Sequence, residues 1–188
     1  MGISNEKGVL YWEFYGAIVI IILGFVFHFA FFWFNQWKPL ALFFAVNESV
    51  WEHCKIGFWP ALLFFLAEYY FIKNKANNYV LAKATSLFII PATIIVIFYT
   101  YTGIIGFNLF PIDISIFFIA VILGQYASYK LLVAKPLGRY YGSMAIVLGI
   151  ILVISFSTFT FKPASIPIFI DNNSGSYGIP NSTLELSN

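Results

Sequence analysis

The sequence predicts an all-α integral membrane protein, a bundle of five transmembrane helices. Of its 188 residues, 61% are hydrophobic and only 10% are charged, whereas about a quarter of the residues in a soluble domain are charged. The mean hydropathy is +0.86. Apolar runs of about 20 residues, the length that crosses the hydrocarbon core of a bilayer, recur along the chain as far as residue 161. No strand-like alternation and no internal repeat competes with this prediction.

Five segments are long and apolar enough to cross a bilayer. The first, residues 14–34, is too long for the hydrophobic region of a signal peptide and no small-residue cleavage site follows it, so we expect it to be retained. Residues 40–46 form an apolar approach to the second span and are expected to dip towards the membrane before that helix begins. The later predicted spans are residues 47–72, 79–101, 112–134 and 140–161.

The apolar pattern stops after Lys162. The following stretch contains DNNSGSYG at residues 171–178, a cluster of residues typical of turns and loops. We therefore predict a transmembrane domain over residues 1–162 and an extracytoplasmic tail over residues 163–188.

The basic residues predict the orientation. An odd number of spans places the two termini on opposite sides, and cytoplasmic loops carry the excess of Lys and Arg. Seven basic residues share the side of the N-terminus, and three lie on the other side. The seven are Lys7, Lys73, Lys75, Lys83, Lys130, Lys135 and Arg139, and the three are Lys38, Lys55 and Lys162. We therefore expect a multi-pass plasma membrane protein with a cytoplasmic N-terminus and an external C-terminus.

The composition also limits which classes of partner are expected. The formal net charge is only +2 and the basic residues are dispersed, which argues against a nucleic-acid partner. The expected partner is the lipid bilayer, and a second copy of the chain or another membrane protein is a further candidate.

A polar cluster opens the second predicted span, in the sequence VNESVWEHCK at residues 46–55. On a helix, Glu48 and Glu52 would fall within roughly 40° of each other and share a partner. Charged groups at membrane depth normally face a protein interior or a wet cavity. The cluster therefore favours a site in which Glu48, Glu52 and His53 are the candidate catalytic residues.

A purely structural interpretation of the same cluster is also specific. Ser49 and Glu52 fit the S-x-x-E capping box, which satisfies free N–H groups in the first turn of a helix. A local Glu–Lys pair involving Lys55 would account for one more polar residue. Glu48 and His53 are left without a structural explanation.

Further polar residues reach the same predicted depth from other parts of the chain. His28 lies in the outer half of the first span, where an interhelical hydrogen bond is as good an explanation as a ligand role. Histidine nitrogen together with carboxylate oxygen suits Zn²⁺ or another divalent metal. We therefore predict His28, His53 and Glu48 as candidate metal ligands. The secondary polar residues are Asn47, Tyr101, Asp113 and Asp171.

The spacing gives no tight local ligand pair. The sequence contains no H-E-x-x-H, H-x-x-x-H or E-x-x-H motif, so a metal site would be assembled across helices. On the inner side, Glu68 is expected to be a helix-end or surface charge. Gln125, Ser128 and Tyr129 form a polar stripe in the fourth span and are expected to hold helices together.

The chain resembles an uncharacterised family of small polytopic prokaryotic membrane proteins. The resemblance rests on VNESVWEH (residues 46–53), FYTYTGIIG (98–106), DIS (113–115), PASIPIFID (163–171) and GSYGI (175–179). The resemblance covers nearly the whole chain, but it implies no particular activity. It implies that the polar cluster and the tail form one unit, with the tail as a candidate lid.

A looser similarity is to the ceramidase-like intramembrane hydrolases. In that family, a Ser and a His four residues apart precede an Asp and a later His pair around zinc. Ser49 and His53 have the first spacing, but the later His pair is absent because His28 and His53 are the only histidines.

The leading hypothesis from the sequence is a metal-assisted hydrolase or transferase acting on a lipid or a membrane-embedded substrate. In this hypothesis His28, His53 and one glutamate hold the metal, and the other glutamate carries a proton. Two alternatives stay open: a transporter or ion-binding protein, and a structural or assembly partner with no chemistry.

Overall fold

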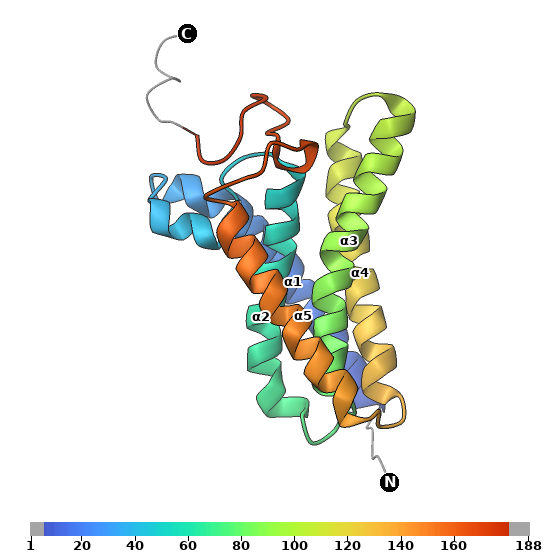
Figure 1. The fold of residues 1–188 in the computed structure, drawn as a ribbon. Coiled ribbons are helices and arrows are strands. Elements are labelled where there is room, and N and C mark those ends of the chain that lie inside the picture. The colour runs from blue at the N-terminus through green and yellow to red at the C-terminus, as the bar shows by residue number, and fades with distance from the viewer. Residues whose placement is uncertain (1–5, 181–188) are drawn as a thin grey trace.

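The computed structural model describes residues 6–180, which form an all-helical bundle (Figure 1). Five of the helices are long and apolar enough to span a membrane, which confirms the predicted fold class. The long helices are α1 (Glu6–Trp33), α2 (Val50–Ile72), α3 (Tyr79–Ile105), α4 (Phe110–Val133) and α5 (Arg139–Phe159), and the short 3₁₀ helices are η1 (Lys38–Leu42) and η2 (Pro167–Phe169).

Two helix starts differ from the prediction by three residues or more, and each difference changes where a glutamate lies. Helix α1 begins at Glu6 rather than near residue 14, so Glu13 lies inside the helix and is buried. Helix α2 begins at Val50, because Ser49 is its N-cap and accepts a hydrogen bond from the backbone N–H of Glu52. Glu48 therefore stands in the loop before the helix.

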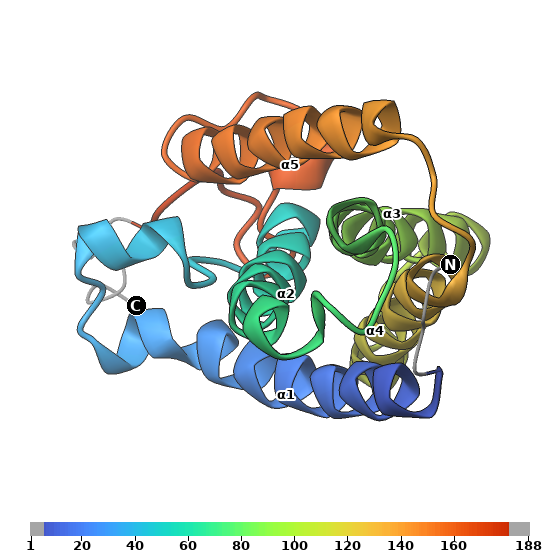
Figure 2. The same cartoon turned by 90° about the horizontal axis from the view of Figure 1, so that it is seen from below.

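Helix α2 lies in the middle of the bundle and α5 at its edge. Seen along the bundle in Figure 2, α2 and α3 lie between α1 and α5, while α4 packs against α1 and α3. The helices approach closely at glycines, as is common in membrane proteins. A Cβ on Gly124 would lie 2.6 Å from Ile90 of α3, and one on Gly24 would lie 2.4 Å from the Phe117 ring of α4.

The outer surface is strongly apolar. In helix α5, only 11% of an apolar stretch of 18 residues is buried. The exposed residues of this helix are chiefly aliphatic and aromatic, among them Ile146, Ile150 and Ile154. Transmembrane helices with such a surface imply contact with the lipid bilayer.

The two ends of the bundle carry different structures. The start of α1 lies at one end, and residues 163–180, the C-terminal segment, lie at the other beside the loop that follows α1 (Figure 1). Phe169 in this segment packs against Trp51, with ring centroids 5.0 Å apart. An antiparallel bridge joins Ile170 to Tyr177. The last eight residues of the predicted tail, 181–188, lie outside the described residues.

The expectation that Glu68 is a helix-end or surface charge is wrong. Its side chain is buried and pairs with Lys83 of α3. The reason is tertiary: α3 packs against α2 and brings both Lys83 and the Tyr79 hydroxyl to this carboxylate. The expected interhelical role of Gln125 is confirmed, since its amide donates to the backbone carbonyl of Glu13.

Candidate functional site

The loop before α2 is held by its own polar side chains. The Asn47 side chain accepts a hydrogen bond from the Ser49 backbone N–H at 3.0 Å. The Glu52 carboxylate reaches back to the Val46 N–H at 3.1 Å. The predicted Ser49–Glu52 cap is therefore confirmed on the Ser49 side, whereas the returning carboxylate bonds to Val46 instead of to the cap residue itself.

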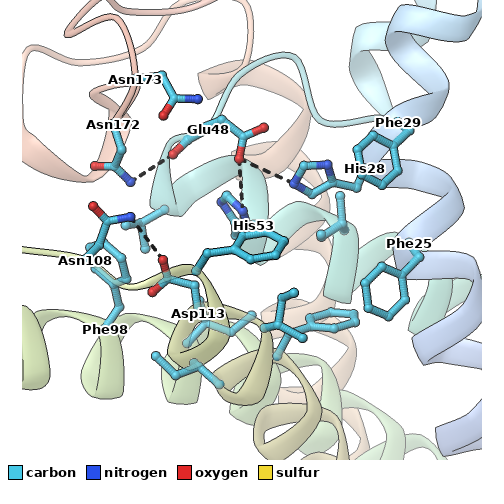
Figure 3. A pocket seen from close by; sticks show the side chains of 17 residues that line it. Phe25, His28, Phe29, Glu48, His53, Phe98, Asn108, Asp113, Asn172 and Asn173 are labelled. Atoms are coloured by element: carbon cyan, nitrogen blue, oxygen red, sulfur yellow. Dashed lines mark hydrogen bonds and ion pairs between the residues drawn. The ribbon is translucent and has the colours of Figure 1, made fainter.

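The C-terminal segment fixes this loop from the outside. Asp171 accepts a hydrogen bond from the Glu48 backbone N–H at 3.3 Å, and the Asn172 amide donates to the Glu48 carbonyl at 2.9 Å. The Asn47 amide donates to the carbonyl of Gly178 at 2.8 Å. With both its backbone polar groups bonded, Glu48 directs its side chain into the space between α1 and α2 (Figure 3).

Three potential metal ligands meet in that space. The Glu48 Oε2 atom lies 3.5 Å from His28 Nε2 and 3.5 Å from His53 Nε2. The three side chains offer ligand atoms that all lie within 4.8 Å of one another. We call His28, Glu48 and His53 the triad. Its members come from α1, the loop and α2, as expected of a site assembled across separate segments.

For His53, hydrogen bonding indicates which ring nitrogen faces the Glu48 carboxylate as a lone pair. His53 Nδ1 lies 2.8 Å from the Ser49 carbonyl oxygen, which only accepts, so Nδ1 carries the proton in the neutral ring. Its Nε2 then presents a lone pair to Glu48. Two acceptors that face each other repel, and a proton or a cation bound between them would remove this repulsion.

The charge state of Glu48 fits the same picture. The pKa of its carboxyl group is lowered from the usual 4.5, chiefly by its hydrogen-bonding contact with His28 and in spite of partial burial. Glu48 is therefore a carboxylate at neutral pH and an available oxygen ligand.

The triad lies on the wall of a pocket of about 490 Å³, a volume typical of small-molecule sites. The pocket opens between the α1–α2 pair and the α3–α4 pair, and most of its wall is apolar. Aromatic rings contribute much of that wall, and their residues are Phe25, Phe29, Phe98, Phe110 and Phe117.

Asp113 faces the triad from the α4 side of the same pocket (Figure 3). The Tyr101 hydroxyl donates a hydrogen bond to one of its oxygens, and the Asn108 amide donates to the other at 3.1 Å. Of the predicted secondary residues, Asp113 lines the pocket, Tyr101 supports Asp113, and Asn47 and Asp171 hold the loop.

Glu52 does not join the triad. Its carboxylate forms a buried ion pair with Lys55 and accepts a hydrogen bond from the Thr160 hydroxyl at 2.9 Å. The expectation that Glu48 and Glu52 share a partner is wrong, since the helix starts only after Glu48. The predicted local Glu–Lys pair is confirmed.

Sequence reasoning missed several residues that the structure places at the pocket. Asn108, Asn172 and Asn173 line it, although each reads as an ordinary loop residue. The sequence carries one signal for two of them, since Asn172 and Asn173 directly follow Asp171 in a stretch implied to act together with the polar cluster.

Comparison with known proteins identifies a family but no activity. No curated protein and no solved structure matches the chain significantly. The model of a family of unknown function, DUF6512, matches residues 1–179, and the chain belongs to this family.

Proposed function

We propose that this member of the DUF6512 family is a metal-dependent hydrolase or transferase that acts on a lipid or another membrane-embedded substrate. His28, Glu48 and His53 would hold a divalent ion such as Zn²⁺. The observation that carries the proposal is the convergence of two imidazole nitrogens on one carboxylate oxygen, each at 3.5 Å, at the wall of an apolar pocket.

The ligand chemistry fits zinc. Ligand atoms held about 2.0–2.1 Å from a tetrahedral ion lie about 3.3 Å from one another, close to the two measured separations of 3.5 Å. The third pair lies within 4.8 Å, so the two imidazole rings would move closer together when the ion binds. The Ser49 carbonyl orients His53 through Nδ1, as outer-shell acceptors do for metal-binding histidines.

Three protein ligands leave one coordination position open, which is the arrangement of catalytic rather than structural sites. A metal held in this way would polarise a carbonyl or phosphoryl oxygen and acidify a water molecule. Asp113, on the facing wall, is our candidate proton acceptor. Tyr101 and Asn108 occupy both its oxygens with donated hydrogen bonds and so fix its orientation.

Glu52 is not assigned this role. The sequence predicted it as a catalytic proton carrier, but its carboxylate is buried against Lys55 and does not line the pocket. We therefore transfer the proton-carrying role from Glu52 to Asp113.

The substrate class follows from the pocket wall. Phenylalanine and isoleucine side chains would bury acyl or other apolar groups, while the triad and Asp113 would meet a polar linkage such as an ester, an amide or a phosphoester. The pocket end is proposed to face outward, in line with the excess of basic residues at the other end. The C-terminal segment would then act as a lid, since Asn172 and Asn173 line the pocket.

The first experiment is elemental analysis of the protein purified in mild detergent without chelators. Wild type and Asn108→Ala, a pocket variant that keeps the triad, are expected to contain about one metal ion per chain, whereas His53→Ala and Glu48→Gln are expected to contain almost none. Size-exclusion profiles check that each variant is monodisperse.

The outcomes separate the candidate functions. Wild-type protein without metal would overturn the proposal. Bound metal with no turnover of lipid esters, amides or phosphoesters would favour an ion-binding protein or transporter. If only His53→Ala is misfolded, Glu48→Gln alone decides the assignment of the site.

A further inference from the structure

A second cluster of buried charged groups lies near the other end of the bundle, away from the pocket. Lys83 of α3 forms ion pairs with Glu13 of α1 and with Glu68 of α2. All three residues are buried, with exposed fractions of 4% for Lys83, 3% for Glu13 and 1% for Glu68. We call Glu13, Glu68 and Lys83 the buried trio.

The ammonium group of Lys83 has partners on several sides. Besides its two carboxylate contacts, its ammonium group lies 4.6 Å from the centroid of the Phe65 ring and 5.4 Å from that of Tyr79, in positions that favour a positive charge. One ammonium balances one carboxylate. With both glutamates ionised, the trio would carry one surplus negative charge away from water, which is costly.

Among the side chains that the structure describes, no second cation contacts the two carboxyl groups. Their other side-chain contacts are the Ser128 hydroxyl, which bonds to Glu13 at 3.2 Å, and the Tyr79 hydroxyl, which lies 3.1 Å from Glu68. The Tyr69 ring packs against Tyr79. None of these side chains is a base that ionises to a cation.

The two carboxyl groups also have spare oxygens. Glu13 Oε2 and Glu68 Oε1 are buried and have no hydrogen-bond partner among the described residues. Native proteins rarely leave buried polar atoms unsatisfied. A proton on one of these oxygens would remove the surplus charge of the trio.

The ion pair between Glu52 and Lys55 gives an internal contrast. There one carboxylate meets one ammonium, and the two oxygens of Glu52 are bonded to Val46, Lys55 and Thr160. That pair is neutral and complete. The buried trio differs from it by one carboxyl group and two unsatisfied oxygens.

We propose that Glu13, Glu68 and Lys83 form a proton-binding site, in which the two carboxyl groups share one proton at neutral pH. The site lets the protein take up and release a proton within the bundle. It involves no residue of the triad or the pocket, so it stands independently of the proposed metal chemistry.

The test counts protonated carboxyl groups by infrared difference spectroscopy of the carboxylic C=O stretch, at neutral pH in detergent. Relative to wild type, Glu13→Gln and Glu68→Gln are each expected to lose one carboxylic acid signal, because the remaining carboxylate then pairs with Lys83. Lys83→Met is expected to gain one, because both carboxyl groups are then protonated.

The matched control is Glu6→Gln, an exposed residue of the same helix, which is expected to leave the signal unchanged. His53→Ala is expected to leave it unchanged as well, which separates this proposal from the metal site. If neither glutamine variant loses a signal, both carboxylates are ionised in the wild type and the proposal is overturned. The two glutamine variants decide the matter even if Lys83→Met fails to fold.

Discussion

Lys55 and Lys83 are both buried, yet they stand in different electrostatic surroundings. Lys55 donates to the Ala41 carbonyl at 2.7 Å and forms an ion pair with Glu52, and this pair has no surplus charge. Removing one member of a complete buried pair leaves the other charge without compensation. The Glu52–Lys55 pair is therefore expected to be sensitive to single substitutions.

We predict that Lys55→Met destabilises the protein by about 3–5 kcal/mol, because the Glu52 carboxylate is left buried and unpaired. The double variant Glu52→Gln with Lys55→Met is expected to recover most of that loss. Thermal or denaturant unfolding in detergent measures both, and Lys38→Met, at an exposed lysine, is the control. Equal stability of the single and double variants would contradict the prediction.

The residue types in the site were more predictable than their contacts. Neighbouring sequence positions were enough to identify the Ser49 cap and the Glu52–Lys55 pair, because both form within one turn of a helix. The contact between Glu68 and Lys83 joins two helices, and spacing along the chain carries no signal for it. The triad was predicted from composition and depth, and its convergence required the fold.

At the level of elements, Asp171 accepts three hydrogen bonds that join the C-terminal segment to itself and to the loop before α2. Asp171 accepts hydrogen bonds from the backbone N–H of Glu48, from that of Asn173 at 3.1 Å and from the Ser174 hydroxyl at 2.6 Å. It therefore links the internal turn of the segment to the loop that carries the triad.

We predict that Asp171→Ala releases the C-terminal segment from the loop, because three donors lose their acceptor. Limited proteolysis is expected to cut residues 163–180 several-fold faster in this variant while the helices stay intact. Ser174→Ala removes only one of the three bonds and is the control. An unchanged cleavage rate in Asp171→Ala would contradict the prediction. It would mean that the bonds made by Asn172 and Asn47, together with the packing of Phe169, hold the segment without Asp171.

The elements themselves were largely predictable. The existence and order of the five long helices followed from apolar runs of membrane-spanning length. Helix α1 was predicted to start too late because Glu13 was taken to lie outside the apolar run. The burial of Glu13 depends on its ion pair with Lys83, a residue 70 positions further along the chain.

At the level of the whole molecule, five long helices place the start of α1 and the C-terminal segment at opposite ends of the bundle (Figure 1). The excess of basic residues at the N-terminal end predicts that this end is cytoplasmic. The native cysteine Cys54 is buried, so labelling of introduced cysteines has a low background.

We predict that a membrane-impermeant maleimide labels Ser174→Cys in intact cells and labels Asn74→Cys only after permeabilisation. Both positions are exposed, one in the C-terminal segment and the other in the loop between α2 and α3. The opposite labelling pattern would invert the orientation and place the pocket on the cytoplasmic side.

The contacts between the C-terminal segment and the loop before α2 also have a consequence for biosynthesis. Glu48 is synthesised early, but its backbone partners Asp171 and Asn172 lie 123 and 124 residues later. Until the ribosome has passed those codons, the nascent chain has two histidines and a glutamate near one another without the bonds that fix the glutamate. The pocket rim is therefore among the last parts of the molecule to form, and a chain truncated after α5 would retain its helices without a finished site.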